Sequence, residues 1–196
     1  MFHMGSFIGA VTRAPFCAVA TGVAIVFALG CTRKNADDSC GVPKSCPKEV
    51  VDSSATLSLE RTACYGTCPV YTVTLHGDGT VEWKGISHVD TVGAATAKLD
   101  PSAVQGLFDL AATSCFFAMR DTYELPITDH DWANTTIRAG NRIKTIRHYQ
   151  ATPESAGMDA PPGVCLAPEV LFEIEKRIDD VTGTAKWIGA GGRSRP

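Results

Sequence analysis

An uncharged run near the start of the chain determines which part of the chain can belong to the folded domain. Ala14–Gly30 reads APFCAVATGVAIVFALG, with Arg13 directly before it and no acidic residue anywhere ahead of it. A positive flank, a short apolar core and small residues before a cleavage site are the anatomy of a secretory signal. The run is shorter than the roughly 20 apolar residues that a membrane-spanning helix needs, and it contains Pro15 and Gly22. We therefore expect residues 1–30 to be a signal peptide that takes no part in the folded domain, with a retained helix as the alternative.

The end of this run carries a second signal. Phe27–Cys31 reads FALGC and resembles the lipobox of bacterial lipoproteins, with Ala28 where leucine is commoner. The resemblance implies that Cys31 becomes the first residue of the mature chain and receives acyl chains such as palmitate, which would anchor the protein to a membrane. Thr32 follows where an aspartate would favour the inner membrane, so the resemblance implies the outer membrane, with the domain outside the cytoplasm. An ordinary cleaved signal without a lipid is the alternative.

Charge and cysteine content narrow the classes of function. The chain has 196 residues and a net charge of −3, which leaves room for one ordinary domain with tails and gives no basic excess. We therefore expect no nucleic-acid partner, because such proteins carry a basic surface. Eight cysteines are many for a cytosolic protein of this size. Outside the cytoplasm they are typical of disulfide bonds.

The segment after the signal is polar and has no hydrophobic period. Residues 31–54 run from the lipidated cysteine through TRKNADDSCGVPKSCPKEVVDSS. Such composition favours a flexible tether that lifts the domain off the bilayer. A small disulfide loop between Cys40 and Cys46 would stiffen part of it.

Alternating apolar and polar residues predict strands in the region 55–188. The alternation covers residues 57–60, then 71–75 and 81–83 on either side of a Gly-Asp-Gly turn, which together predict a β-hairpin. Residues 135–139 and 143–149 predict a second hairpin around Gly-Asn. A weaker strand is expected within residues 88–98.

Two segments have helical spacing instead. Asp100-Pro101 is a typical helix start, and the apolar stripe that follows is Val104, Leu107, Phe108 and Ala111. The second helix is expected to begin at Pro168 and end at Gly183, with the stripe Leu171, Ile174, Ile178 and Val181. We therefore expect an α+β domain, a small antiparallel sheet built from two hairpins with two helices packed on it. Residues 189–196 are expected to be a disordered tail.

The most distinctive stretch is RTACYGTCPVY, from Arg61 to Tyr71, with a C-x-G-x-C-P-x-Y core. It resembles the signature of an uncharacterised bacterial family, the domain-of-unknown-function 6438 family, which follows this motif with a turn like Gly77-Asp78-Gly79. The likeness extends over roughly residues 55–190 and implies a fold unit and an extracytoplasmic habit, but no reaction. The candidate functional positions are Arg61, Gly66, Pro69, Tyr71, Asp78, Gly79, Tyr123 and Asp129.

The motif cysteines favour a disulfide over a metal site. Cys64 and Cys68 are spaced C-x-x-x-C, and no second pair completes a zinc ribbon. Gly66 permits the turn that a disulfide needs, and Pro69 directs the chain into the next strand. So short a loop contributes only about 2 kcal/mol. The alternative is a thiol–disulfide redox protein that uses this pair, with Arg61 favouring a reactive thiolate. Against it, the segment that follows is β, whereas thioredoxin-like chemistry begins a helix at the first cysteine.

Cys115 and Cys165 are the remaining pair. One ends the first predicted helix and the other precedes the second. We expect a disulfide between them that ties the two helices together. Its loop of about 50 residues gives roughly 4 kcal/mol in the chain-entropy model.

Asp129-His130-Asp131, with Asp121 and Glu124 nearby, is the cluster that would suit a cation or acid–base chemistry. It supports a second alternative, a metal-dependent or hydrolytic enzyme. A polar loop before a strand explains the same residues, so no metal ligand is assigned. Arg61 falls on the same alternating positions of the predicted strand as Leu57 and Leu59, so we expect it to face the core and to need an acidic partner such as Asp129 or Asp121.

These observations favour a binding or structural role over catalysis. The sequence has no Gly-rich phosphate loop, nucleophile elbow or Ser/His/Asp spacing, so we assign no catalytic residue and no cofactor. The expected partners are a membrane, through the lipid anchor, and an envelope protein, peptide or glycan. Enzymatic activity stays open.

Overall fold

The computed structural model describes Cys40, residues 42–43, 45–47 and 52–152, Asp159 and residues 161–190. The expected signal peptide, the lipidated Cys31 and residues 191–196 of the expected tail (189–196) lie outside these described residues. Within the described part, no helix has the length and hydropathy that a membrane span requires.

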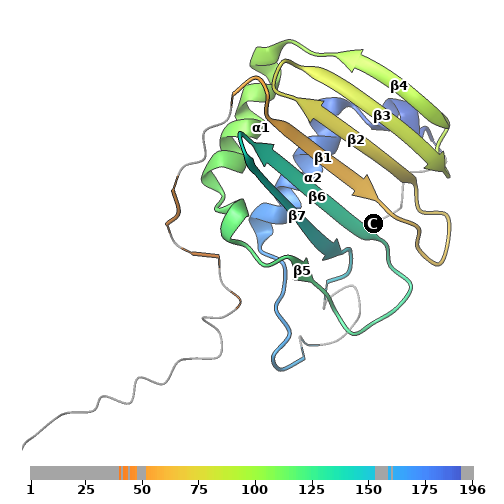
Figure 1. Ribbon diagram of the computed structural model, residues 1–196. Coiled ribbons are helices and arrows are strands. Elements are labelled where there is room, and N and C mark those ends of the chain that lie inside the picture. Colours follow the sequence, from red (N-terminus) through yellow and green to blue (C-terminus); the bar gives the residue numbers. More distant parts are fainter. Residues whose placement is uncertain are drawn as a thin grey trace, which may run out of the picture. The chain divides into compact units, whose positions relative to one another are not determined.

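A seven-stranded sheet organises the described residues, in the order β4-β3-β2-β1-β6-β7-β5 (Figure 1). Neighbouring strands are antiparallel, except that β5 runs parallel to β7. The strands are β1 Thr56–Arg61, β2 Val70–His76, β3 Thr80–Ser87, β4 Gly93–Lys98, β5 Thr122–Tyr123, β6 Trp132–Ala139 and β7 Arg142–Tyr149.

The α+β class and both hairpins are confirmed, but the sheet is larger than expected and mixed. β1 lies between the hairpins β2–β3 and β6–β7, with Leu57 opposite Leu75 on one side and Ile137 on the other. Leu57 and Leu59 are fully buried, which agrees with the central position of β1, because a strand with one fully buried face has its register strongly specified against its neighbours. The parallel pair β5–β7 was missed, since two residues carry no period to recognise.

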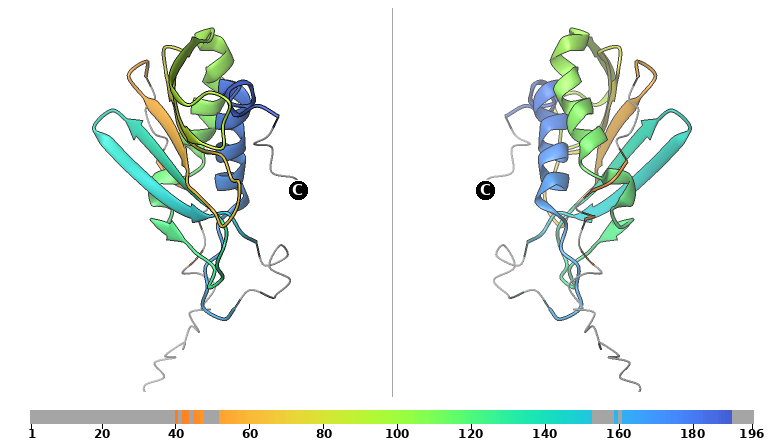
Figure 2. Two further views of the ribbon diagram at one scale, coloured as in Figure 1. Left: turned by 90° about the vertical axis from the view of Figure 1, so that its right-hand side faces the viewer. Right: turned by 90° about the vertical axis from the view of Figure 1, so that its left-hand side faces the viewer.

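Helices α1 (Pro101–Thr113) and α2 (Glu169–Thr182) lie together on one face of the sheet (Figure 2). α1 begins as predicted, with the Asp100 carboxylate accepting a hydrogen bond from the Ser102 N–H at 2.8 Å. α2 ends at Gly183, whose φ of 67° is the left-handed conformation that closes many helices. Two short elements complete the chain, the 3-10 helix η2 (Phe116–Ala118) and helix α3 (Ala185–Ile188).

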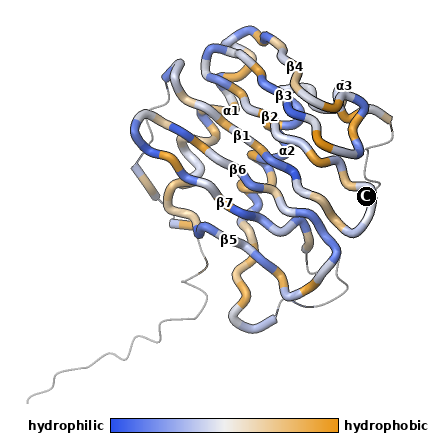
Figure 3. The backbone as a smooth tube through the Cα atoms, turned by 45° about the vertical axis from the view of Figure 1, so that its right-hand side comes forward, coloured by the Kyte–Doolittle hydropathy of each residue, from blue (hydrophilic) through white to orange (hydrophobic). Residues whose placement is uncertain are grey.

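The core lies between the helices and the inner face of the sheet. Hydrophobic and hydrophilic positions succeed one another along the strands (Figure 3), and the apolar ones face α1 and α2. Trp83 of β3 stacks between Tyr71 and Trp187, with ring centroids 4.7 and 5.1 Å away. Each such aromatic pair contributes about 1 kcal/mol beyond its buried area. The stack therefore fixes α3, which carries Trp187, against the sheet.

Three disulfides close the described residues, and two of them differ from the expected pairing. Cys64–Cys68 is as predicted, but Cys40 bonds Cys165 and Cys46 bonds Cys115, with Cα separations of 5.1 and 5.5 Å. The predicted pairs Cys40–Cys46 and Cys115–Cys165 were wrong. The sequence pattern indicates where the helices begin and end, but it does not indicate that the segment containing Cys40 and Cys46 lies next to those helix ends. Cys115 lies just after α1 and Cys165 just before α2, so the bonds hold the segment of Cys40 and Cys46 next to the end of one helix and the start of the other. The expected tether is therefore fastened to the domain at two points.

Candidate functional site

The C-x-G-x-C-P-x-Y loop is rigidly built. Its disulfide joins Cys64 and Cys68, and the Gly66 N–H donates to the Cys64 carbonyl at 2.9 Å. The Tyr65 N–H donates to the Asp129 carbonyl at 3.1 Å, which ties this loop to the one before β6. The Tyr65 residue itself is 89% exposed. A fixed loop that presents an exposed aromatic side chain is typical of a binding surface.

Arg61, at the end of β1, faces the core side as predicted, but its acidic partners are on α2. Its Nη2 donates to Asp179 Oδ2 at 3.1 Å, and its Nη1 lies 3.9 Å from Glu175 Oε2. Asp129 and Asp121 were the wrong partners: Asp129 engages the motif loop through its carbonyl, and the Asp121 carboxylate binds Lys144 at 2.5 Å. Sequence patterns alone do not distinguish among acidic residues that lie far apart along the chain.

Asp179 also holds Tyr71 of β2. The Tyr71 hydroxyl donates to Asp179 Oδ1 at 2.7 Å, and the Thr184 hydroxyl reaches the same oxygen at 3.2 Å. Burial raises the pKa of Tyr71, and the Asp179 charge raises it further, so the phenol stays protonated. Burial alone would lower the pKa of Arg61, but Asp179 and its other neighbours raise that pKa above its usual value. Arg61, Tyr71 and Asp179 therefore form a fixed, charged cluster.

This cluster continues inward through Gln150. Gln150 accepts a hydrogen bond from Arg61 Nη1 at 2.7 Å and donates to Glu175 Oε2 at 3.0 Å. Glu175 Oε1 lies 3.0 Å from His148 Nδ1, and both side chains are 2% exposed. A carboxylate can only accept, so we place the imidazole proton on Nδ1. Each buried polar group of this network has a partner, as stable buried networks require.

A cleft of about 1060 Å³ opens above the cluster. Arg61, Pro69 and Tyr71 contribute from the motif side, and His130 and Asp131 from the loop before β6. The far wall comes from the end of α2, the turn after it and α3, and includes Lys176, Asp179, Asp180 and Thr184. The structure thus brings together two features that the sequence singled out separately, the motif and part of the Asp-His-Asp cluster.

Several other candidate positions do not line this cleft. Asp78 stabilises the β2–β3 turn by accepting from the Thr80 N–H at 2.8 Å. Gly79 has φ 86°, and a Cβ there would lie 2.2 Å from the Leu99 carbonyl oxygen, so its role is structural. Gly66 has no left-handed φ, and a Cβ there would meet only Cys64 Sγ, at 3.6 Å, so the loop does not require a glycine at this position.

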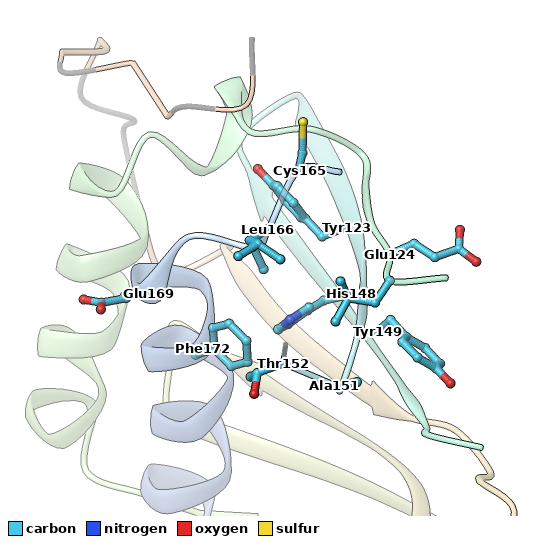
Figure 4. A pocket seen from close by; sticks show the side chains of 12 residues that line it. Tyr123, Glu124, His148, Tyr149, Ala151, Thr152, Cys165, Leu166, Glu169 and Phe172 are labelled. Carbon is cyan, nitrogen blue, oxygen red and sulfur yellow. The ribbon is translucent and has the colours of Figure 1, made fainter. Parts of the chain in front are cut away.

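Tyr123 lies at a second, smaller pocket of about 280 Å³ (Figure 4). Leu166, Phe172 and the His148 ring turn toward one another there, whereas Glu124 and Glu169 point away on opposite sides (Figure 4). The pocket is mostly apolar, and the His148 Nδ1 is already engaged by Glu175. It therefore offers few polar groups that would orient a ligand.

The cluster Asp129–Asp131 is dispersed by the backbone. Asp129 has φ 84°, and the cleft wall includes only His130 and Asp131 of the three. Among the described residues, no three His, Cys, Asp or Glu side chains lie together in a way that would hold a metal ion.

The site residues on α2 were not predicted from the sequence. Glu175 and Asp179 follow Leu171 at successive steps of four, so they form one line beside the buried stripe of the helix. Acidic residues on the inner side of an amphipathic helix are the signal that was available, because a buried carboxylate requires a partner.

Comparison with protein families matches residues 55–162 to a family described as Domain of unknown function (DUF6438). The match contains every strand of the sheet and ends before α2, so it is shorter than the likeness over residues 55–190 expected from the motif. No curated protein matches the chain.

Proposed function

The chain belongs to the DUF6438 family, and from the geometry of its cleft we propose that it is a binding module of the bacterial cell envelope. One observation carries the proposal: the motif loop, the loop before β6 and the end of α2 meet at a single cleft. The polar groups beneath it are held by hydrogen bonds of 2.7 to 3.1 Å between distant segments. A site fixed before its ligand arrives loses little entropy on binding.

We further propose that the domain is outside the cytoplasm and is held to a membrane by acyl chains on Cys31. The three disulfides support this compartment, because such bonds persist in oxidising surroundings. Eight residues separate Cys31 from Cys40, so this segment spans at most about 30 Å. The domain would therefore remain close to the bilayer surface.

The cleft and the end of the domain that follows the proposed anchor are at opposite ends of α2. Cys165 precedes α2, whereas Asp179, Gly183 and Thr184 of the cleft are at the other end of the helix. α2 has 14 residues, which corresponds to about 20 Å. Because the domain would stay close to the bilayer, we propose that the ligand is an envelope component next to the membrane, namely the peptidoglycan layer.

The charges of the cleft favour binding of an uncharged or weakly cationic part of peptidoglycan. Arg61 and Lys176 are its two permanent cations, and both already pair with acids, Asp179 and Asp180. A strongly anionic ligand would find no uncompensated cation among the lining residues that the structure describes. Asp131 adds an acceptor to the lining of the cleft, and Tyr65, on the motif loop but not among the lining residues, adds an exposed aromatic surface.

Co-sedimentation with purified peptidoglycan sacculi tests the proposal. We expect the mature protein to sediment with sacculi, and Tyr65→Ala and Asp131→Ala each to weaken binding about tenfold, equivalent to about 1.4 kcal/mol. Ile143→Ala is the control, because Ile143 is 54% exposed on β7 and lies outside the cleft. The proposal fails if the protein does not bind sacculi, or if both Tyr65→Ala and Asp131→Ala bind as tightly as the Ile143→Ala control.

A further inference from the structure

β4 forms one edge of the sheet and pairs only with β3 among the described residues. The opposite edge is β5, which has two residues, whereas β4 has six. A long edge strand leaves a row of backbone N–H and C=O groups without partners in the sheet. β4 is therefore the edge that can accept another strand.

The direction of these groups follows from the ladder with β3. The Leu99 N–H donates to the Gly79 carbonyl at 2.9 Å. In an antiparallel pair the hydrogen-bonded residues alternate, so Gly93, Ala95 and Ala97 direct their backbone groups toward β3. Ala94, Thr96 and Lys98 then direct theirs away from the sheet.

The usual protection of an edge is missing from β4. Natural edges are blunted by charged side chains, prolines or bulges. β4 reads GAATAK, without a proline, and its one charge is at its last residue. The Lys98 Nζ is held by Asp78 and Thr80, at 3.0 and 2.9 Å, so it is directed to the β2–β3 turn.

Large apolar side chains are exposed beside the start of this edge. Val92 is 67% exposed, and Ile86 of β3 is 50% exposed. Gly85 pairs with Gly93, which places Ile86 and Val92 next to each other at the end of the ladder. Exposed apolar residues beside unpaired backbone groups are typical of a surface that another chain covers.

We propose that the β4 edge pairs antiparallel with the β4 edge of a second copy of this chain. Symmetry restricts the register, because both copies must keep their helices on the same face of the joined sheet. In one register, the backbone N–H and C=O groups that point away from β3 form hydrogen bonds between the two copies. This register places Ala94 opposite Thr96 of the second copy and Ala95 opposite Ala95 of the second copy. Val92 then lies opposite Lys98 of the second copy, whose ammonium group stays on Asp78 and Thr80 of its own copy and brings no free charge to the joined edge.

The edge favours its own copy because it is complementary to itself. No like charges meet between residues 92 and 98 in this register, and the small alanines let the strands approach closely. Two six-residue strands form a small interface. We expect a weak, reversible dimer, as is typical of small interfaces. This inference is independent of the cleft and of its ligand.

Sedimentation equilibrium of the mature chain with Cys31→Ser, which removes only the acyl chains, tests the pairing over a series of concentrations from micromolar upward. Thr96→Pro is the informative variant, because the N–H that it removes points away from β3, so the ladder within one copy is kept. Thr96→Val is the matched control, since it retains the N–H. We expect a monomer–dimer equilibrium whose dissociation constant rises at least about tenfold in Thr96→Pro and stays unchanged in Thr96→Val.

The inference is overturned if the chain is monomeric throughout the series, or if Thr96→Pro dimerises like the unchanged chain. Circular dichroism checks that Thr96→Pro is folded. If it is not, Thr96→Lys replaces it, because a charge at the centre of the edge opposes pairing without changing the backbone. Equal dimerisation of a folded Thr96→Lys would also overturn the inference.

Discussion

The pair of Arg61 and Asp179 provides the sharpest test of how the cleft is built. Arg61 is on β1 and Asp179 is on α2, and their side chains are 17% and 22% exposed. Asp179→Asn removes the negative charge and nearly keeps the shape. Among the described residues, Arg61 would then retain only Glu175, at 3.9 Å, as a charged partner.

The expected cost follows from this partial burial. Breaking a fully buried ion pair costs 3–5 kcal/mol, whereas an exposed pair is worth about 0.2–1 kcal/mol. For side chains that are mostly but not fully buried, we expect Asp179→Asn to lower the free energy of unfolding by about 3 kcal/mol. This corresponds to a fall in Tm of roughly 6–12 °C for a chain of this size.

A double-mutant cycle separates the pair from its surroundings. Arg61→Met, Asp179→Asn and the double variant are unfolded in urea and followed by far-UV circular dichroism. We expect a coupling free energy of about 2 kcal/mol between the two positions. The control is Lys176→Met, because Lys176 is 76% exposed in its pair with Asp180 and should contribute below about 0.5 kcal/mol. A coupling below about 0.5 kcal/mol between Arg61 and Asp179 would refute the reasoning.

Two further predictions concern the disulfides and the alkaline range. Replacing Cys46 and Cys115 by alanine should lower the free energy of unfolding by about 4 kcal/mol, and replacing Cys64 and Cys68 should lower it by about 2 kcal/mol. The difference arises because the first bond spans 69 residues and the second spans 4. Urea unfolding measures both values, and the reverse order would contradict the prediction. Because the pKa of Tyr71 is raised on folding, the folded state holds the phenol proton more tightly than the unfolded state does. The resulting contribution to the free energy of unfolding is complete below about pH 10 and is lost as the pH rises above it. Tm measured against pH should therefore fall less steeply above pH 10 in Tyr71→Phe, and equal slopes would contradict the assignment.

Local patterns in the sequence were sufficient for most of the fold. The alternation in β2 and β3, the Gly-Asp-Gly turn and the Asp100-Pro101 helix start all depend on neighbours a few residues apart. The central place of β1 could not be obtained in this way, because its pairing with β6 joins segments about 75 residues apart. The disulfide pairing failed for the same reason, since it depends on where the segment around Cys40 and Cys46 lies in space.

The candidate site was predictable only in part. The motif identified Arg61 and Tyr71, and strand parity indicated that Arg61 faces inward. The identity of its partner depends on the rotation and position of α2, which places Asp179 there and leaves Asp129 and Asp121 to other contacts. Tyr123 was selected with the motif, but it lies at the smaller pocket, because β5 pairs with β7.

The position of the ligand is best established by an NMR titration of the mature chain carrying Cys31→Ser, with soluble peptidoglycan fragments as the probe. The proposed binding role predicts that backbone amide shifts concentrate at Cys68, His130, Gln150, Gly183 and Thr184, the residues around the cleft. Amides near Leu166 and Phe172, at the smaller pocket, should stay unchanged. Shifts confined to that smaller pocket, or no shifts at all with fragments in large excess, would contradict the proposal that the cleft binds the cell wall.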